Sequence, residues 1–140
     1  MAIRPYLAFN GNCREAFTRY QEILGGELVL LRMADLPADA GPPPPGANAD
    51  LVMHGALTLD DGLLMGADDP SGSFDGKVHG MCVNCSVPTV ADAKRVFDAL
   101  STEGQVQMPL GETFYAPAFG MCIDRFGTPW MVMVEAPVPS

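Results

Sequence analysis

The segment EAFTRYQEI, residues 15–23, recurs 77 positions later as DAKRVFDAL, residues 92–100. The two copies agree in residue type at four positions: one acidic, one alanine, one aromatic and one aliphatic. The matching residues are Glu15 and Asp92, Ala16 and Ala93, Tyr20 and Phe97, and Ile23 and Leu100. Within each copy the apolar residues recur every three or four positions, a spacing typical of an amphipathic helix. The sequence therefore predicts two equivalent helices, and the repeat indicates a fold built from two similar units.

The ends of the predicted helices are also marked. Asn12 stands three residues before Glu15, the spacing of a capping box, and predicts the start of the first helix. Gly25 and Gly26 predict its end. Thr89 gives the second helix the same kind of start.

Strand-like segments rich in β-branched and aromatic residues flank both helices. They are residues 3–9, 27–33, 51–59 and 63–67 around the first helix, and residues 79–87, 105–108, 116–123 and 130–135 around the second. Each half thus has the order β-α-β-β-β. We predict an α+β fold of one domain, residues 1–140, in which two tandem modules (about 1–70 and 77–137) form curled mixed sheets around a shared cleft, with the helices on the outer faces. Such a cleft is a typical place for a small ligand.

Composition excludes several classes of protein. Of the 140 residues, 48% are hydrophobic and 18% are charged, which is unlike a disordered chain. The chain has 17 acidic and 8 basic residues and a net charge of −9, so a basic surface for nucleic acid or anionic lipid is not expected. Neither a signal peptide nor an apolar run of roughly 18 residues is recognisable. We therefore expect a cytoplasmic protein without nucleic-acid or membrane partners.

Two local motifs are less informative than they first look. Cys82 and Cys85 form a C-x-x-C pair, but the surrounding residues predict a strand, in which side chains three apart point to opposite faces. We expect these two thiols, with Cys13 and Cys122, to be reduced and packed. Residues 36–50 contain the run Pro42–Pro45 and predict a loop that is either a lid over a site or a tolerated insertion.

Three stretches make the chain resemble a known superfamily. They are PYLAFNGNC at 5–13, AFTRYQEILGG at 16–26, and residues 112–130, which end in the pattern D-x-F-G-x-x-W at 124–130. They are similar to the PhnB-like branch of the vicinal oxygen chelate superfamily of glyoxalases, bleomycin-resistance proteins and extradiol dioxygenases. The resemblance covers nearly the whole chain and implies a glyoxalase-like fold and a homodimer whose second chain completes the cleft.

The resemblance also raises two questions of cofactor chemistry. Members of the branch are sometimes described as demethylubiquinone methyltransferases, but the chain lacks a glycine-rich strand-to-helix loop followed by an acidic residue about 20 positions on, typical of an adenosine-type cofactor site. Metal-dependent members of the superfamily place four His, Gln or Glu ligands on the inner strands. Through the repeat these places fall on Pro5, Met65 or Gly66, Cys82 and Met131. This set does not suit a divalent ion, so we expect neither cofactor nor metal.

Two polar residues are candidates for ligand contacts. His54 lies in the middle of a strand with Val52 and Ala56 at alternate positions, so it either faces the cleft as a hydrogen-bonding or acid–base group or is a structural histidine at a sheet face or dimer contact. Glu112 precedes Phe114 and Tyr115. Burial beside these rings would raise the pKa of its carboxyl and suit it to act as a base, whereas an exposed Glu112 would have no role.

Aromatic and sulfur-containing side chains complete the candidate site. Phe114, Tyr115, Phe119 and the single tryptophan, Trp130, are expected to line an apolar pocket, although Trp130 also suits a core. Asp124 is expected to shape a turn by accepting backbone amides. Most of the nine methionines fall in or beside predicted strands, where we expect them to fill sheet cores.

Two functions fit these observations. The first is a metal-free module that binds a small aromatic or amphipathic molecule through the aromatic residues and methionines, with His54 and Glu112 as polar anchors. The second is a lyase, isomerase or dioxygenase that holds a metal in a non-standard way, through His54, Glu112 and a cysteine. The missing ligands favour the first.

Overall fold

The computed structural model describes residues 1–37, 39, 41 and 48–136. The run Pro42–Pro45, for which we predicted polyproline character, lies outside the described residues. The chain divides into two compact units, Met1–Gly76 (unit 1) and Lys77–Ser140 (unit 2).

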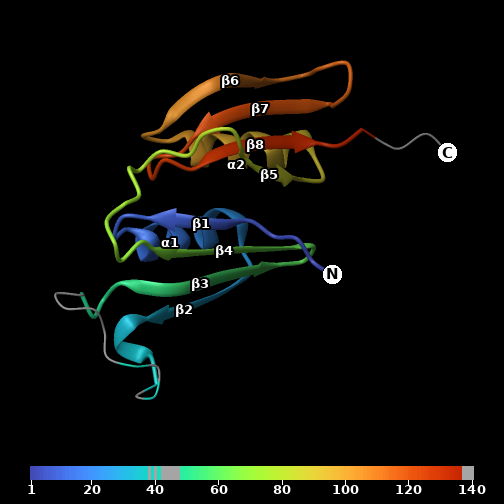
Figure 1. Ribbon diagram of the computed structural model, residues 1–140. Coiled ribbons are helices and arrows are strands. Elements are labelled where there is room, and N and C mark those ends of the chain that lie inside the picture. Colours follow the sequence, from blue (N-terminus) through green and yellow to red (C-terminus); the bar gives the residue numbers. More distant parts are fainter. Residues whose placement is uncertain (38, 40, 42–47, 137–140) are drawn as a thin grey trace. The chain divides into compact units, whose positions relative to one another are not determined.

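Unit 1 has the order β-α-β-β-β. Its elements are β1 (Tyr6–Phe9), α1 (Cys13–Leu24), β2 (Glu27–Arg32), the short 3-10 helix η1 (Met33–Asp35), β3 (Val52–Leu59) and β4 (Gly62–Asp68). The four strands form one mixed sheet in the order β1-β4-β3-β2, in which β1 runs parallel to β4 and the other pairs are antiparallel (Figure 1).

Unit 2 repeats this arrangement. Its elements are β5 (Val83–Ser86), α2 (Val90–Ser101), β6 (Gln105–Gly111), β7 (Ala118–Ile123) and β8 (Pro129–Val134). The sheet order β5-β8-β7-β6 and the single parallel pair, β5 with β8, match those of unit 1 (Figure 1). The two tandem modules predicted from the repeat are therefore confirmed.

Some predicted boundaries were wrong. The strand predicted over 79–87 begins only at Val83, because the chain before it is irregular and Gly80 has a φ of +76°. The strand predicted over 105–108 continues to Gly111. Gly25 and Gly26 end α1 as predicted, with φ values of +78° and +88° that other residues rarely adopt.

The helix of each unit covers one face of its own sheet. A side chain added at Gly66 of β4 would come within 2.8 Å of the Phe17 ring in α1, and one at Gly120 of β7 within 2.9 Å of the Phe97 ring in α2. Side chains alternate between the two faces of a strand, so the neighbours of these glycines point away from the helix. We call that second face of each sheet its open face.

The apolar core of each unit lies between the sheet and its helix. Phe17 and Tyr20 of α1 are fully buried in the core of unit 1, and Val96 and Phe97 of α2 are buried in the core of unit 2. No described helix is long and apolar enough to cross a membrane.

Candidate functional site

The strand register of unit 2 places three methionines in one row. Met108 of β6 pairs with Met121 of β7, which pairs with Met131 of β8. Asn84 of β5 continues the row at the sheet edge. The open face of this sheet carries Asn84, Ser86, Gln105, Met108, Phe119, Met121, Ile123, Pro129, Met131 and Met133. None of these strand residues is charged, but Ser86 Oγ donates a hydrogen bond of 3.0 Å to Glu135 Oε1. The open face of unit 2 is therefore centred on flexible thioethers and has a carboxylate near Ser86 of β5.

The methionines correct an expectation. We expected most of them to fill sheet cores, yet Met33 is the only one of the nine that is buried. The alternation of a strand explains the difference, because Met121, Met131 and Met133 alternate with the buried residues that face α2. Their positions therefore make them surface residues of the open face rather than core.

An aromatic cluster extends this face into the connection between β6 and β7. Thr113 and Ala116 close a turn through three hydrogen bonds. The Thr113 amide and Oγ1 donate to the Ala116 carbonyl at 3.0 and 3.3 Å, and the Ala116 amide donates to Thr113 Oγ1 at 3.0 Å. The ring centroids of Phe114 and Tyr115 are 4.9 Å apart, and those of Tyr115 and Phe119 are 5.5 Å apart. Phe114 is 100% exposed and Phe119 is 7% exposed, so the cluster runs from solvent to the sheet.

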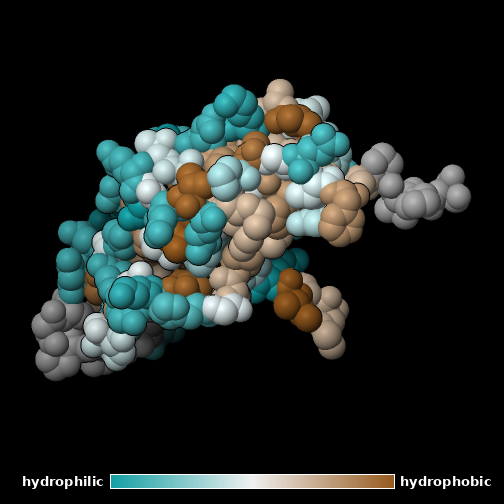
Figure 2. All heavy atoms as spheres, turned by 90° about the horizontal axis from the view of Figure 1, so that it is seen from above, coloured by the Kyte–Doolittle hydropathy of each residue, from teal (hydrophilic) through white to brown (hydrophobic). Residues whose placement is uncertain are grey.

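Apolar side chains reach the surface between polar ones (Figure 2). Among the large exposed apolar residues are Phe114 and Tyr115 and, on the edge strand β6, Val106 and Met108. Glu112, which precedes this aromatic pair, is also exposed.

Trp130 belongs to the core rather than to either surface. It is 1% exposed, and its indole Nε1 donates a hydrogen bond of 2.8 Å to Asp124 Oδ2. Asp124 Oδ1 accepts from the amides of Phe126 at 2.9 Å and Thr128 at 3.0 Å. The prediction that Asp124 shapes this turn is confirmed, and the tryptophan of the D-x-F-G-x-x-W pattern is its third donor.

His54 points onto the open face of unit 1. Its neighbour Gly55 faces α1, since a side chain there would lie 3.8 Å from the Cys13 sulfur. The alternation that we assumed, with Val52 and His54 on one face, is wrong, because a β-bulge intervenes. Leu31 pairs with His54, but the next residue of β2, Arg32, pairs with Val52. Val52 is fully buried, whereas His54 is half-buried.

Tyr6 is the partner of His54. The Tyr6 Oη lies 3.0 Å from His54 Nδ1, and the two ring centroids are 5.8 Å apart. Tyr6 comes from β1 and His54 from β3, so this hydrogen bond spans β4. Partial burial raises the pKa of the Tyr6 phenol, and the Cys13 thiol adds to this effect. We did not single out Tyr6 from the sequence, although it lies in the segment PYLAFNGNC that carries the family resemblance.

The surroundings of this pair are apolar. The residues of the open face of unit 1 are Tyr6, Ala8, Glu27, Val29, Leu31, His54, Ala56, Thr58, Leu63, Met65 and Ala67. Glu27, at the start of β2, is the one charged member of this set.

The residues at the superfamily's metal positions do not fit a divalent ion. Gly66 packs under Phe17, while Met65 and Met131 lie on the open faces and offer only thioethers. Within the described part of the chain, no three His, Cys, Asp or Glu side chains come together as a metal site would require. No chemical step can be derived through a metal held by these residues.

The four cysteines are free thiols. Burial raises the pKa of Cys13 to about 12, and the nearby Asp68 carboxylate adds to the shift. Burial likewise raises the pKa of Cys122 to about 11, with Asp124 adding to it. Both thiols therefore stay protonated at neutral pH and are poor nucleophiles.

Alkaline solution is expected to weaken the fold through Cys13 and Cys122. Because the folded state raises both pKa values, their stabilising contribution is fully present below the unfolded pKa of about 9 and is lost progressively as the pH rises from there towards the folded values. Urea unfolding at about pH 8 and about pH 10.5 should show this loss, and the double variant C13A/C122A should lose less stability over that range. An equal loss in both proteins would contradict this expectation.

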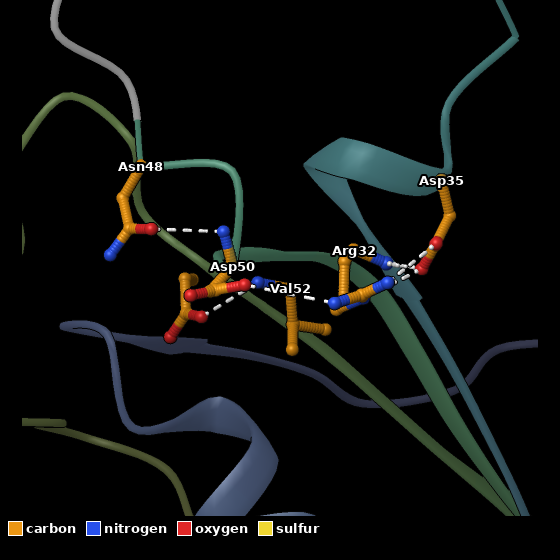
Figure 3. Close-up of polar contacts among 6 residues, drawn as sticks. Arg32, Asp35, Asn48, Asp50 and Val52 are labelled. Atoms are coloured by element: carbon orange, nitrogen blue, oxygen red, sulfur yellow. Dashed lines mark hydrogen bonds and ion pairs between the residues drawn. The ribbon is translucent and has the colours of Figure 1, made fainter.

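Ion pairs of Arg32 connect the residues at the two ends of the segment 36–50 (Figure 3). The Arg32 guanidinium donates to both carboxylate oxygens of Asp35 at 3.0 Å and lies 3.7 Å from Asp50 Oδ1. The Asp50 amide donates to Asn48 Oδ1 at 2.9 Å. The hydrogen bonds from Arg32 lower the pKa of Asp35. The two ends of this segment are thus held together. The alternative that the segment is a lid concerns residues that mostly lie outside the described part of the chain.

Comparison with known proteins agrees with this architecture. The family model described as 3-demethylubiquinone-9 3-methyltransferase matches residues 1–133. Protein YjdN of Escherichia coli (strain K12) is 31% identical over 148 residues, and the match covers 100% of this chain and 99% of YjdN.

Solved structures extend the comparison. Protein PA1353 from Pseudomonas aeruginosa is 43% identical with a TM-score of 0.85, covering 96% of this chain and 98% of that one. A PhnB protein from Bacillus cereus, whose description also carries the 3-demethylubiquinone-9 3-methyltransferase name, is 25% identical with a TM-score of 0.75, covering 96% and 99%.

A more distant likeness concerns the fold alone. The glyoxylase/bleomycin resistance protein/dioxygenase domain from Frankia sp. EAN1pec is 16% identical with a TM-score of 0.62, covering 97% of this chain and 98% of that domain. The resemblance seen in the sequence is therefore confirmed: the chain belongs to the PhnB-like family described as 3-demethylubiquinone-9 3-methyltransferase, and it has the glyoxalase-like fold.

Proposed function

We propose that this protein binds a small aromatic or amphipathic molecule on the open faces of its sheets. The observation that carries the proposal is the row Met108, Met121 and Met131 across the open face of unit 2. Thioethers adapt their shape to flat apolar molecules and make favourable contacts with aromatic rings. Burying such a surface under a ligand is favourable at roughly 25 cal/mol per Å² of apolar area.

The aromatic cluster next to the row supports the proposal. Phe114 and Tyr115 are exposed, and the Tyr115 ring contacts both Phe114 and Phe119, which lies on the sheet. Rings in this arrangement can stack on a planar ligand at its margin. We propose His54 and Glu112 as polar anchors, with Glu112 only as a hydrogen-bonding group at the margin, because its exposure does not suit it to act as a base. Trp130 supports the sheet from its buried side, because its indole is already engaged by Asp124.

Methyl transfer is not the activity that we propose, although the family description names it. The connection from β1 to α1 has only three residues, 10–12, with one glycine. The amides of Gly11 in this connection and of Cys13, the first residue of α1, donate to Asp68 Oδ1 at 2.9 and 3.0 Å. In an adenosine-type cofactor site, amides at this place would be available to the cofactor. Here a protein carboxylate occupies them.

We also propose that the protein is a cytoplasmic homodimer. The family resemblance suggests it, and the exposed Val106 and Met108 on the edge strand β6 support it, because a self-complementary apolar edge is typical of a symmetric contact.

Substitution of Met131 by lysine is expected to weaken binding of an apolar probe. The neutral fluorescent probe N-phenyl-1-naphthylamine should bind the parent protein, and M131K should bind it at least about tenfold more weakly, because a charge must be desolvated at the centre of the row. The matched control is M81K, since Met81 is 62% exposed and lies outside both open faces. Fluorescence titration measures both variants. Absence of probe binding in the parent, or equal weakening by M81K, would overturn the proposal.

A further inference from the structure

The open face of unit 1 contains one built polar feature, the hydrogen bond between Tyr6 and His54. Its two atoms lie 3.0 Å apart, and the bond joins two strands that are not neighbours in the sheet. Small residues make this possible. Gly55 pairs with Gly66, so His54 stands opposite Ala67, and Ala67 pairs with Ala8 on β1. These alanines leave room above β4 for the two rings to meet.

The hydrogen bond determines which ring nitrogen of His54 is left for a ligand. Nδ1 is engaged with the Tyr6 hydroxyl, so Nε2 is the remaining polar atom of the ring. When a neutral imidazole accepts a hydrogen bond at Nδ1, its proton resides on Nε2. When the ring is protonated, Nδ1 donates to the phenol oxygen and Nε2 again carries a proton. Nε2 carries a proton in both of these forms, whereas in the other neutral tautomer Nδ1–H donates to the phenol oxygen and Nε2 is an acceptor. We assign the donor to Tyr6, because a phenol O–H is a stronger donor than an imidazole N–H and an imidazole nitrogen is a stronger acceptor than a phenol oxygen.

We propose that Tyr6 and His54 form a recognition site for a carbonyl oxygen on a planar aromatic molecule, with His54 Nε2 as the donor and Tyr6 as the residue that positions it. The inference rests on the proposed function, since it takes the open faces to be ligand surfaces. The chemistry of the face supports a neutral acceptor. His54 has Leu31 beside it on β2 and Ala56 on its own strand, so a ligand ring there meets apolar side chains.

The position of this donor among apolar residues also favours discrimination between ligands with and without an oxygen acceptor. A polar group surrounded by apolar residues binds a ligand with the matching acceptor and disfavours the same ligand without it, because the donor would be covered and left unpaired. The pair therefore selects among flat molecules of equal size according to whether they carry an oxygen acceptor.

Two isosteric probes test this selectivity. Fluorene and 9-fluorenone have the same ring system and differ by a carbonyl in place of a methylene group. Equilibrium dialysis should show that the parent protein binds 9-fluorenone at least about tenfold more tightly than fluorene. H54F should remove this preference while retaining fluorene binding, and H79F is the matched control because His79 is the only other histidine. Y6F should reduce the preference only in part, since the donor remains but is no longer held.

A spectroscopic readout separates this role from a merely structural one. With only two histidines in the chain, nitrogen-15 spectra of the imidazoles can be assigned by comparison with H79F. His54 should show a protonated Nε2 whose resonance moves when 9-fluorenone is added and does not move with fluorene. Equal affinity of the parent protein for the two probes, or an undiminished preference for 9-fluorenone in H54F, would overturn this inference. If fluorene still binds in that case, the proposed function is not contradicted. Failure of both these probes and N-phenyl-1-naphthylamine to bind would overturn both.

Discussion

Replacing Asp124 with alanine is expected to lower the free energy of unfolding by about 4 kcal/mol, because three donors lose their acceptor in a buried place. Asp124 is 5% exposed and Thr128 is 3% exposed. The carboxylate accepts from two amides of the turn and from the indole of Trp130. Water cannot easily replace an acceptor at such a site, so the loss approaches the full desolvation cost of the donors.

The single tryptophan makes this expectation easy to measure. Urea unfolding followed by Trp130 fluorescence gives both the stability and the environment of the indole. D124A should unfold at lower urea concentration, and its native emission should shift to the red as water reaches the ring. A loss below about 1 kcal/mol would contradict the assigned role of the carboxylate.

A double-mutant cycle isolates the indole contact. W130F removes the donor while keeping a ring in the core, and D124N keeps only one acceptor oxygen. If the contact at 2.8 Å contributes to stability, D124N should cost less in the W130F background than in the parent. Additive losses would show that Asp124 acts through the turn amides alone.

Much of the fold could be predicted because its signals are local. The helical spacing, the glycines after α1 and the D-x-F-G turn each depend on residues close in sequence, and the repeat showed that the two halves share one topology. The strand predicted at 79–87 contained Gly80, whose positive φ breaks an extended segment, and the sequence does not reveal that φ. Most methionines were assigned to the core because hydrophobicity alone does not say which face of a strand a residue occupies.

The candidate site was harder to predict because its geometry depends on pairing between strands. The face of His54 was inferred from simple alternation with Val52, and the bulge opposite Arg32 breaks that alternation. Tyr6 was missed because its partner lies 48 residues away and across another strand. Such contacts are determined by register, which no local pattern reports.

The start of α1 shows the same limit and leads to the second large effect. Asn12 was expected to cap this helix, but its side chain makes no capping hydrogen bond. Asp68, the last residue of β4, takes that role. It is 3% exposed, and its two oxygens accept from the amides of Gly11, Cys13 and Val52 at 2.9 to 3.0 Å. One carboxylate thus joins the start of α1 to the start of β3.

D68A is expected to lower the free energy of unfolding by about 3 kcal/mol or more, since three amides lose their acceptor and the helix N-terminus loses a neighbouring negative charge. D68N should fall between, because its amide nitrogen would face a donor. The measurement is urea unfolding, with circular dichroism as the signal.

The two helix starts supply matched controls for Asp68. N12A should change stability by less than about 0.5 kcal/mol, because Asn12 makes no side-chain cap, whereas T89A should cost about 1 kcal/mol, because Thr89 Oγ1 accepts from the Asp92 amide at 3.1 Å. The sequence presents these two residues as equivalent caps, so similar losses in N12A and T89A would refute the assignment to Asp68. A large loss in D68A beside a silent N12A would instead show that a residue 56 positions from Asn12 caps α1. The same result would establish that the amides before α1, which a nucleotide cofactor would need, are already committed to the protein's own carboxylate.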